Sequence, residues 1–247
     1  MFRKIERKAT EGIAAEWDVL APVRFQQITS GEDITYHHIL VPSVLGLMPR
    51  EPVAAALDAG CGIGYLTNLL TDHSARVVGV DASAESIDLA RAHFGTRAEF
   101  IQETLESHSA KNTGAYDMVV ANMVLMDVPD LHVFVSALHL VLRPKGVLIF
   151  SVTHPCFWPN YYGYDQEPWY RYDRELIIES PFRITSRPDC PFLSTHIHRP
   201  LEAYIGALRE ACFSIDYLRE PMPSPDVEAR YPLPWTTPRY LVGLCRR

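Results

Sequence analysis

The sequence has no paired-cysteine pattern and no long uninterrupted apolar run. Its five cysteines, none of them in a C-x-x-C pair, are Cys61, Cys156, Cys190, Cys212 and Cys245. This count and spacing argue against a disulfide framework and a zinc site, so we expect no metal. No apolar stretch approaches the ~18 residues that span a bilayer, and the charged residues 1–8 do not resemble a signal peptide. These absences favour the cytoplasm and no membrane partner.

Basic residues are also scarce. The chain has 23 Lys and Arg against 30 Asp and Glu, a formal net charge of −7. Non-specific nucleic-acid binding needs clustered positive charge, so we expect no nucleic-acid partner. With 247 residues, 47% hydrophobic and 21% charged, the composition is typical of a globular chain with one large domain. A homodimer is compatible with these totals.

The first positive feature is an apolar run that ends in an acid and three alternate glycines. Residues 54–57 lead into Asp58, then Gly60, Gly62 and Gly64 follow, and an apolar helical stripe begins at once. This order predicts a strand, a tight turn and a helix. Gly60 allows the sharp turn, whereas Gly62 and Gly64 leave the backbone open to a ligand. The start of the helix offers free N–H groups to that ligand.

A second acid follows the next predicted strand. The run Arg76–Val80 is strongly β-forming and ends at Asp81, which lies 21 residues (81 − 60) after Gly60. An acid about 20 residues after the first glycine is placed to hold a ribose diol, because a carboxylate can accept two hydroxyl donors. Together the two features predict a site for an adenosine-bearing cofactor.

The glycine spacing distinguishes between cofactors. The dinucleotide fingerprint is G-x-G-x-x-G, whereas this chain has G-x-G-x-G, with Tyr65 at the position of that third glycine. The segment resembles motif I of the class I S-adenosylmethionine-dependent methyltransferases, (D/E)-x-G-x-G-x-G, and the resemblance extends over about residues 53–152. It implies S-adenosyl-L-methionine as the cofactor. Three sets of cofactor-binding residues follow from the resemblance. Glu103 and Thr104 would lie near the adenine, and Asn122 and Met123 would lie beneath the methyl donor. The others belong to the glycine loop and the end of the second strand: Asp58, Ala59, Gly60, Cys61, Gly62, Gly64, Tyr65, Asp81 and Ala82.

The hydrophobic periodicity and the resemblance together predict an α/β fold. We expect a Rossmann-like seven-stranded sheet with helices on both faces, an antiparallel C-terminal hairpin and an aromatic-rich cap inserted after strand five. The expected strands are 54–58, 76–81, 99–102, 116–122, 147–152, 213–218 and 240–245. The expected segments of the single domain 1–247 are a helical lid (1–52), a cofactor-binding core (53–152), the cap (153–200) and a C-terminal helix with a strand pair (201–247).

The expected cap is rich in aromatic residues, which are Phe157, Trp158, Tyr161, Tyr162, Tyr164, Trp169, Tyr170 and Tyr172. They would wall a pocket for an apolar or cationic substrate, or they would form a small core that holds the insertion together. The residues that we expect to contact the substrate are Tyr36, His154, Trp158, Tyr162 and His198. Trp17, Tyr36 and His37 are candidates for a lid, although simple packing of an N-terminal helix on the sheet is the better explanation for each of them singly.

His154 is the candidate catalytic residue. It follows the fifth expected strand directly, and Pro155 restricts its backbone to extended conformations. A histidine suits proton transfer near neutral pH, so His154 could take a proton from a hydroxyl or an ammonium group as the methyl arrives. A structural hydrogen bond is the alternative role.

The sequence therefore predicts a methyltransferase that acts on a nitrogen or oxygen nucleophile of a small organic molecule. One alternative is a methyltransferase for a peptide N-terminus or another macromolecule, although no Asn-Pro-Pro-Tyr-type loop occurs at residues 121–124. A nicotinamide-dependent oxidoreductase is a second alternative, which the glycine spacing disfavours. A cofactor-binding protein without catalysis is a third.

Overall fold

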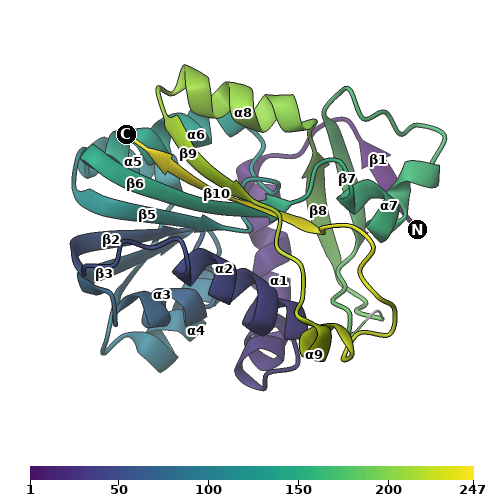
Figure 1. Cartoon of the computed structure of the whole chain (residues 1–247), viewed down its shortest axis with the longest axis horizontal. Coiled ribbons are helices and arrows are strands. Elements are labelled where there is room, and N and C mark those ends of the chain that lie inside the picture. Colours follow the sequence, from purple (N-terminus) through teal and green to yellow (C-terminus); the bar gives the residue numbers. More distant parts are fainter. Residues whose placement is uncertain (188) are drawn as a thin grey trace.

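A seven-stranded sheet forms the centre of the molecule and separates two layers of helices (Figure 1). The computed structural model describes residues 1–187 and 189–247. The strand order is β4-β3-β2-β5-β6-β10-β9, in which β10 runs antiparallel to both β6 and β9. The strands are β2 (Val53–Ala59), β3 (Ser74–Asp81), β4 (Glu99–Gln102), β5 (Tyr116–Asn122), β6 (Leu142–Thr153), β9 (Ser214–Arg219) and β10 (Tyr240–Arg246).

The two faces of this sheet are set by strict alternation along the strands. Leu57 and Val119 pack into the core on one face, whereas Ala56, Met118 and Val120 pack into the core on the other. Successive side chains of a strand point to opposite faces, so apolar runs without polar interruptions are buried on both sides. The continuous apolar pattern of the central strands therefore requires a helical layer on each face.

One helical layer contains α5 (Leu105–Lys111), α6 (Leu131–Val141) and α8 (Leu201–Glu210), shown at the top of Figure 1. The other contains α1 (Thr10–Thr29), the π-helix η1 (Tyr36–Leu40), α2 (Val41–Leu45), α3 (Tyr65–Leu70) and α4 (Ala84–Phe94). The Ser83 side chain caps α4 by accepting the Ser86 N–H at 3.1 Å, and Gly95 follows its last residue, as the sequence indicates.

The fold class is confirmed, including the seven strands and the antiparallel C-terminal pair. The fifth strand starts earlier than expected, at Leu142 rather than Val147, because Leu142 already pairs with Tyr116. Residues Arg143–Gly146 therefore form a distortion within β6, with Lys145 at a φ of 69°. Helix α5 was not among the expected elements; its N-cap is Thr104, which accepts the Ser107 N–H.

The expected cap contains a second sheet that the sequence did not reveal. Strand β7 (Leu176–Pro181) pairs antiparallel with β8 (Leu193–His198) and with β1 (Arg3–Ile5) from the far end of the chain. The cap also holds α7 (Trp158–Tyr162) and the 3₁₀ helix η2 (Tyr164–Gln166), whereas α9 (Pro225–Glu228) follows β9. The segment 1–52, expected to be a helical lid, thus begins with a strand. Residue 188 of the expected cap lies outside the described residues.

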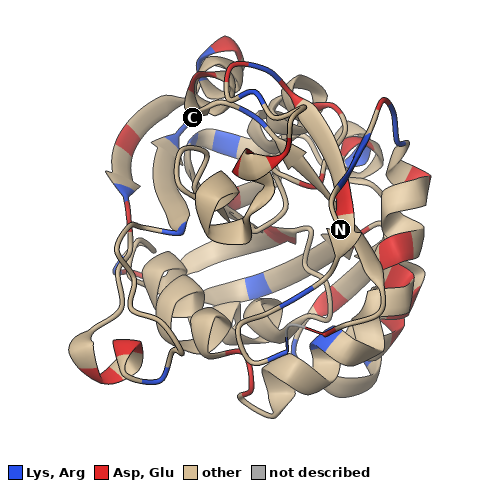
Figure 2. Ribbon diagram, turned by 90° about the vertical axis from the view of Figure 1, so that its right-hand side faces the viewer, with Lys and Arg blue, Asp and Glu red and all other residues tan. Residues whose placement is uncertain are grey.

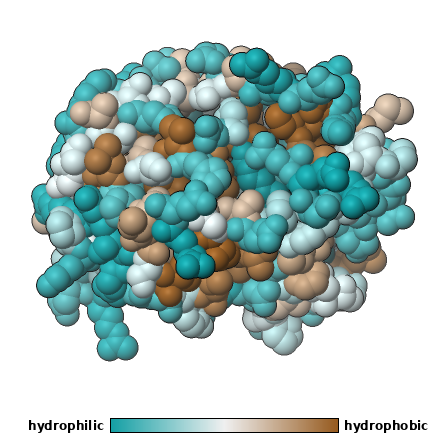
Figure 3. All heavy atoms as spheres, turned by 90° about the horizontal axis from the view of Figure 1, so that it is seen from above, coloured by the Kyte–Doolittle hydropathy of each residue, from teal (hydrophilic) through white to brown (hydrophobic). Residues whose placement is uncertain are grey.

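The outer surface mixes residue types. Over α6 and α8, hydrophilic residues predominate and hydrophobic ones form smaller groups (Figure 3). On the side of the cap, acidic and basic residues are interspersed (Figure 2). Among the described residues, no helix has the length and hydropathy to cross a bilayer. The same residues contain no group of three or more His, Cys, Asp and Glu arranged to hold a metal ion.

Candidate functional site

A cavity of about 960 Å³ lies at the carboxyl-terminal edge of the parallel strands. The glycine loop after β2 and Asp81 at the end of β3 line one part of it, and α7 and the segment before β10 line another. Helix α1 forms part of the wall through Ile13, Trp17 and Ala21. Open α/β sheets bind ligands at this edge, because the loops after the strands converge there. The cavity therefore lies where the sequence places the cofactor.

The glycines of the loop serve different purposes. The Gly62 N–H donates to Asp81 Oδ2 at 2.8 Å, and a Cβ at Gly62 would meet no atom within 4 Å, so this glycine faces open space. A Cβ at Gly64 would lie 2.7 Å from the Phe100 ring and 2.8 Å from Ala90. Gly64 thus allows α3 and α4 to pack closely and does not line the cavity, contrary to the expected ligand contact. All three glycines of the loop have positive φ, from 51° to 77°.

Asp81 is held rigidly at the cavity. Its Oδ1 accepts the Ser83 N–H and its Oδ2 accepts the Gly62 N–H, both at 2.8 Å. Burial raises the pKa of Asp81, and these N–H donors oppose that rise. Each carboxylate oxygen has two lone pairs, so the group retains capacity for two hydroxyl donors. The geometry fits a ribose diol beside the open backbone at Gly62.

Asp58 lies beneath the same loop and is almost completely buried. The Thr67 hydroxyl of α3 donates to Asp58 Oδ2 at 2.7 Å. Burial raises the pKa of Asp58 to about 7, the Thr67 hydrogen bond opposes this rise, and the Asp81 carboxylate adds to it. Asp58 therefore connects the end of β2 to α3, and it also lines the cavity.

Glu103 and Thr104 lie where the resemblance implies the adenine site, and both line the cavity. Glu103 is already engaged, because its Oε1 is 2.8 Å from His108 Nδ1 and its Oε2 accepts a hydrogen bond from Lys111 at 2.6 Å. Thr104 caps α5. The two side chains therefore fix the local structure as well as facing the cavity.

The end of β5 has an unusual backbone that sequence reasoning did not identify. Met123 has a φ of 58°, a conformation that costs a non-glycine residue about 1–3 kcal/mol. Ser151 of β6 holds it there, since the Met123 N–H lies 3.0 Å from both the carbonyl and the hydroxyl oxygen of Ser151. The Ser151 hydroxyl also donates to Asn122 Oδ1 at 2.7 Å. This arrangement presents Asn122 and Met123 to the cavity.

The cap aromatics serve both purposes that the sequence left open. Trp158, Tyr161 and Tyr162 of α7 line the cavity, and the Trp158 and Tyr162 rings stack with centroids 5.0 Å apart. Tyr164 is buried in a separate small core with Leu176, Ile178, Phe2 and other cap aromatics. One part of the cap therefore walls the cavity, and another part holds the cap together.

Two of the three lid candidates face the cavity. Trp17 lines it, and its ring packs edge to face against the ring of Phe182 in the cap, with centroids 5.9 Å apart. Tyr36 lines it beside Tyr65. His37 is turned away, with its Nε2 2.7 Å from the Ile28 carbonyl oxygen.

His154 does not line the cavity. It is 2% exposed; the Cys156 N–H donates to its Nδ1 at 3.2 Å, and its Nε2 donates to Glu220 at 2.8 Å. Both ring nitrogens are occupied, so this arrangement supports the structural alternative. His198 is likewise held by Tyr164 and the Tyr172 carbonyl outside the cavity lining. Of the other expected site residues, only Ala59 and Gly64 are absent from the lining.

Sequence reasoning missed Asp127, an acid of the cavity wall in the loop after β5. Burial raises its pKa well above the usual range, and the Glu16 carboxylate of α1 adds to that rise. Thr195 and His196 of β8 line the same cavity, and the buried Thr195 hydroxyl has no hydrogen-bond partner among the residues that the structure describes. The only available signal was position, because Asp127 follows a central strand by five residues.

Comparison with known proteins agrees with the motifs. A family model described as a methyltransferase domain matches residues 57–150. Over 98 residues the chain is 38% identical to the ubiquinone biosynthesis O-methyltransferase of Cronobacter sakazakii. The aligned residues make up 38% of this chain and 40% of that protein. The alignment thus spans less than half the length of such relatives.

Solved structures share the fold over more of the chain. An S-adenosylmethionine dependent methyltransferase from Mesorhizobium loti has a TM-score of 0.64 at 21% identity, covering 83% of this chain and 96% of that one. The 1,6-didemethyltoxoflavin-N1-methyltransferase of Burkholderia thailandensis scores 0.58 at 18% identity, covering 100% and 94%. The [4+2]-cyclase SpnF scores 0.65 at 14% identity and covers 99% of each chain. At such identities these structures show the fold alone.

The domain match covers strands β2 to β6 and therefore includes the glycine loop, Asp81 and the end of β5. Asp58, Gly60 and Gly62 of the (D/E)-x-G-x-G-x-G pattern line the cavity, as do Asp81 and the end of β5. Residues 57–150 of this chain therefore match a methyltransferase domain, in agreement with the resemblance of their glycine pattern to motif I of the class I S-adenosylmethionine-dependent methyltransferases.

Proposed function

We propose that the chain transfers a methyl group from S-adenosyl-L-methionine to a nitrogen or oxygen atom of a small organic molecule. The observation that carries this proposal is the joint position of Gly62 and Asp81, whose N–H and carboxylate form one open, pre-organised edge of the cavity. The adjoining aromatic wall supports an organic acceptor, and the O- and N-methyltransferases named above support both acceptor atoms.

The residues of the chain mainly bind and orient. The cofactor, when bound, supplies an activated methyl carbon for an in-line displacement. Asp81 and the Gly62 backbone would hold its ribose, and Asn122 and Met123 would form the floor below the reacting groups. Trp17, Trp158 and Tyr162 would exclude water and position the acceptor. In this proposal Asp127, rather than His154, accepts a proton, because it is the one of the two that faces the cavity.

We further infer that the protein works in the cytoplasm on a small molecule. All five cysteines are free thiols in the structure, which suits a reducing compartment. The cavity, one wall of which is built from the cap, favours a small acceptor over a folded macromolecule. A homodimer stays a prediction, which sedimentation analysis would test.

Calorimetry with S-adenosylhomocysteine and with NADH tests the cofactor assignment. We expect binding of the first compound only, and binding of NADH alone would favour the oxidoreductase alternative. A screen of amines, phenols and short peptides with a labelled methyl donor then tests turnover. If the cofactor binds and no acceptor is labelled, a binding protein without methyl transfer, or another reaction on the same fold as in SpnF, becomes the better interpretation.

A further inference from the structure

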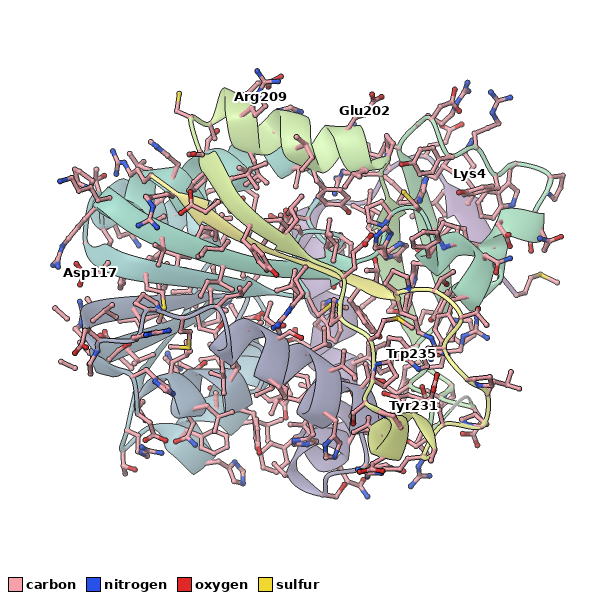
Figure 4. All side chains as sticks on the ribbon, viewed as in Figure 1. Lys4, Asp117, Glu202, Arg209, Tyr231 and Trp235 are labelled. Atoms are coloured by element: carbon pink, nitrogen blue, oxygen red, sulfur yellow. The ribbon has the colours of Figure 1, made fainter. Side chains whose placement is uncertain are left out.

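Arg239 is a buried cation in the wall of the cavity. It immediately precedes β10, is 7% exposed and lines the cavity. Its guanidinium carbon lies 3.7 Å from the centroid of the Tyr161 ring, 4.1 Å from that of Trp235 and 5.5 Å from that of Tyr231. Tyr231 and Trp235 lie together beside α9, with centroids 5.3 Å apart (Figure 4). Aromatic faces therefore hold the guanidinium in place.

No carboxylate neutralises this guanidinium within the described part of the chain. No Asp or Glu there forms an ion pair with Arg239, and its side chain forms no hydrogen bond to another described residue. The other two arginines of the cavity wall differ, because Arg24 pairs with Asp33 at 2.9 Å and Arg183 is an exposed residue that donates to the Tyr162 carbonyl. A buried charge without a partner is costly, and ring faces leave the N–H edges of a guanidinium available.

The position of Arg239 separates it from the cofactor residues. Its neighbour Tyr240 pairs with Thr153 at the end of β6, so Arg239 lies at the same sheet edge as the glycine loop. The order β2-β5-β6-β10 puts three strand spacings between the two, about 14 Å at ~4.8 Å per strand. A ligand on Arg239 would therefore leave the space beside β2 and β3 free for the cofactor.

We propose that Arg239 binds a carboxylate of the acceptor substrate, which is an organic acid whose nucleophilic nitrogen or oxygen lies several bonds from that carboxylate. That the bound acid accepts a methyl group rests on the proposed function. The binding of an acid to Arg239 can nevertheless be measured without any methyl transfer. The planar fork of a guanidinium matches a carboxylate with two parallel hydrogen bonds.

A carboxylate fits better than a phosphate. One unpaired guanidinium matches a single negative charge. Arg24, which also lines the cavity, could not balance the second charge of a phosphate, because Asp33 already neutralises it. The surrounding rings of Tyr161 and Trp235 suit an apolar body attached to the acid. Asp81 lies in the opposite part of the cavity, where its carboxylate would repel the carboxylate of the substrate from the cofactor end and so orient the substrate.

The test measures ligand binding to the protein saturated with S-adenosylhomocysteine. The probes are 4-aminobenzoate and 3-(4-hydroxyphenyl)propionate, each with its primary amide, and phenyl phosphate. We expect calorimetry to show that the wild type binds at least one acid about tenfold more tightly than its amide. In Arg239→Gln that preference should disappear, while the affinities for the amide and for S-adenosylhomocysteine stay within about twofold.

Arg183→Gln is the matched control, because this arginine also lines the cavity and lies over an aromatic ring, that of Tyr162 at 4.2 Å. It should leave the preference for the acid unchanged, and Arg239→Lys should retain only part of it, since lysine lacks the planar fork. Equal binding of acids and amides by the wild type, no binding of any acid, an unchanged preference in Arg239→Gln, or a stronger preference for phenyl phosphate would each overturn the proposal. Failure of S-adenosylhomocysteine to bind would instead contradict the proposed function, since the acids can also be titrated without it.

Discussion

The two ends of the cavity are built in different ways. At the cofactor end, Asp81 is held by the backbone N–H groups of Gly62 and Ser83, which lie within 19 residues of it. At the cap end, Arg239 is held by Tyr161, Tyr231 and Trp235, of which Tyr161 is 78 residues away (239 − 161). The first end depends on short hydrogen bonds in one segment, and the second depends on stacking between distant segments. Because the hydrogen bonds that hold Asp81 and the rings that hold Arg239 share no residue, substitutions at the cap end can change the substrate site without altering the cofactor site.

The largest expected effect lies at the junction of the two ends. Asp127→Asn should lower kcat about 10²–10⁴-fold if the acceptor must lose a proton, because this acid faces the cavity. His154→Asn should stay within about twofold, because its ring is tied to Cys156 and Glu220. Steady-state kinetics and the pH profile of both variants decide the matter. The reverse ranking would restore His154 as the base.

The next effect tests the cofactor end alone. Asp81→Asn removes charge-assisted hydrogen bonds to the ribose and should weaken S-adenosylhomocysteine binding by about 2–4 kcal/mol, or roughly 30- to 1000-fold. The control is Asp88→Asn, at an exposed position on α4. Calorimetry should show unchanged affinity in the control. Wild-type affinity in Asp81→Asn would remove this carboxylate from the site.

A third variant distinguishes packing from binding within the glycine loop. Gly64→Ala should lower the free energy of unfolding by about 1–3 kcal/mol, because the new Cβ would overlap Phe100 and Ala90 at a positive φ. Gly206→Ala on α8 meets no atom within 4 Å and should instead raise it by up to about 1 kcal/mol. Urea denaturation measures both. Equal stability of the two variants would mean that the loop can shift without cost.

The last effect is a slope with pH. Burial raises the pKa of Asp58 from 3.8 to about 7, so the folded state holds a proton that the unfolded state has lost in this range. Stability from this group is fully present below pH 3.8 and is lost as the pH rises toward 7, at up to about 1.4 kcal/mol per pH unit. Without cofactor, Asp58→Asn should flatten that decline in urea titrations. A decline as steep as in the wild type would assign it to other groups.

The sequence predicted the sheet and the cofactor end because their signals are local. Alternating apolar residues, glycine spacing and an acid after a strand are all read within about 25 residues. The second sheet could not be predicted in this way, because Lys4 pairs with Ile178, which lies 174 residues away (178 − 4). Asp127 and Arg239 were missed for a related reason: their importance depends on which charges surround them in the fold. The position of His154 after β6 did not reveal its hydrogen bonds to Cys156 and Glu220, which support the structural alternative.

The strand β1 also bears on how the protein should be handled. The N-terminus lies beside the cap, and the C-terminus lies at the far end of the sheet (Figure 1). The β1 strand is tied to β7 by backbone pairing, and Lys8 bridges to Glu179 at 2.9 Å. A purification tag or a surface linker attached ahead of Met1 would therefore pull on the sheet β1-β7-β8, whose strand β8 forms part of the cavity wall through Thr195 and His196. Attachment after Arg247 leaves that wall free, which makes the C-terminus the better anchor for immobilised assays.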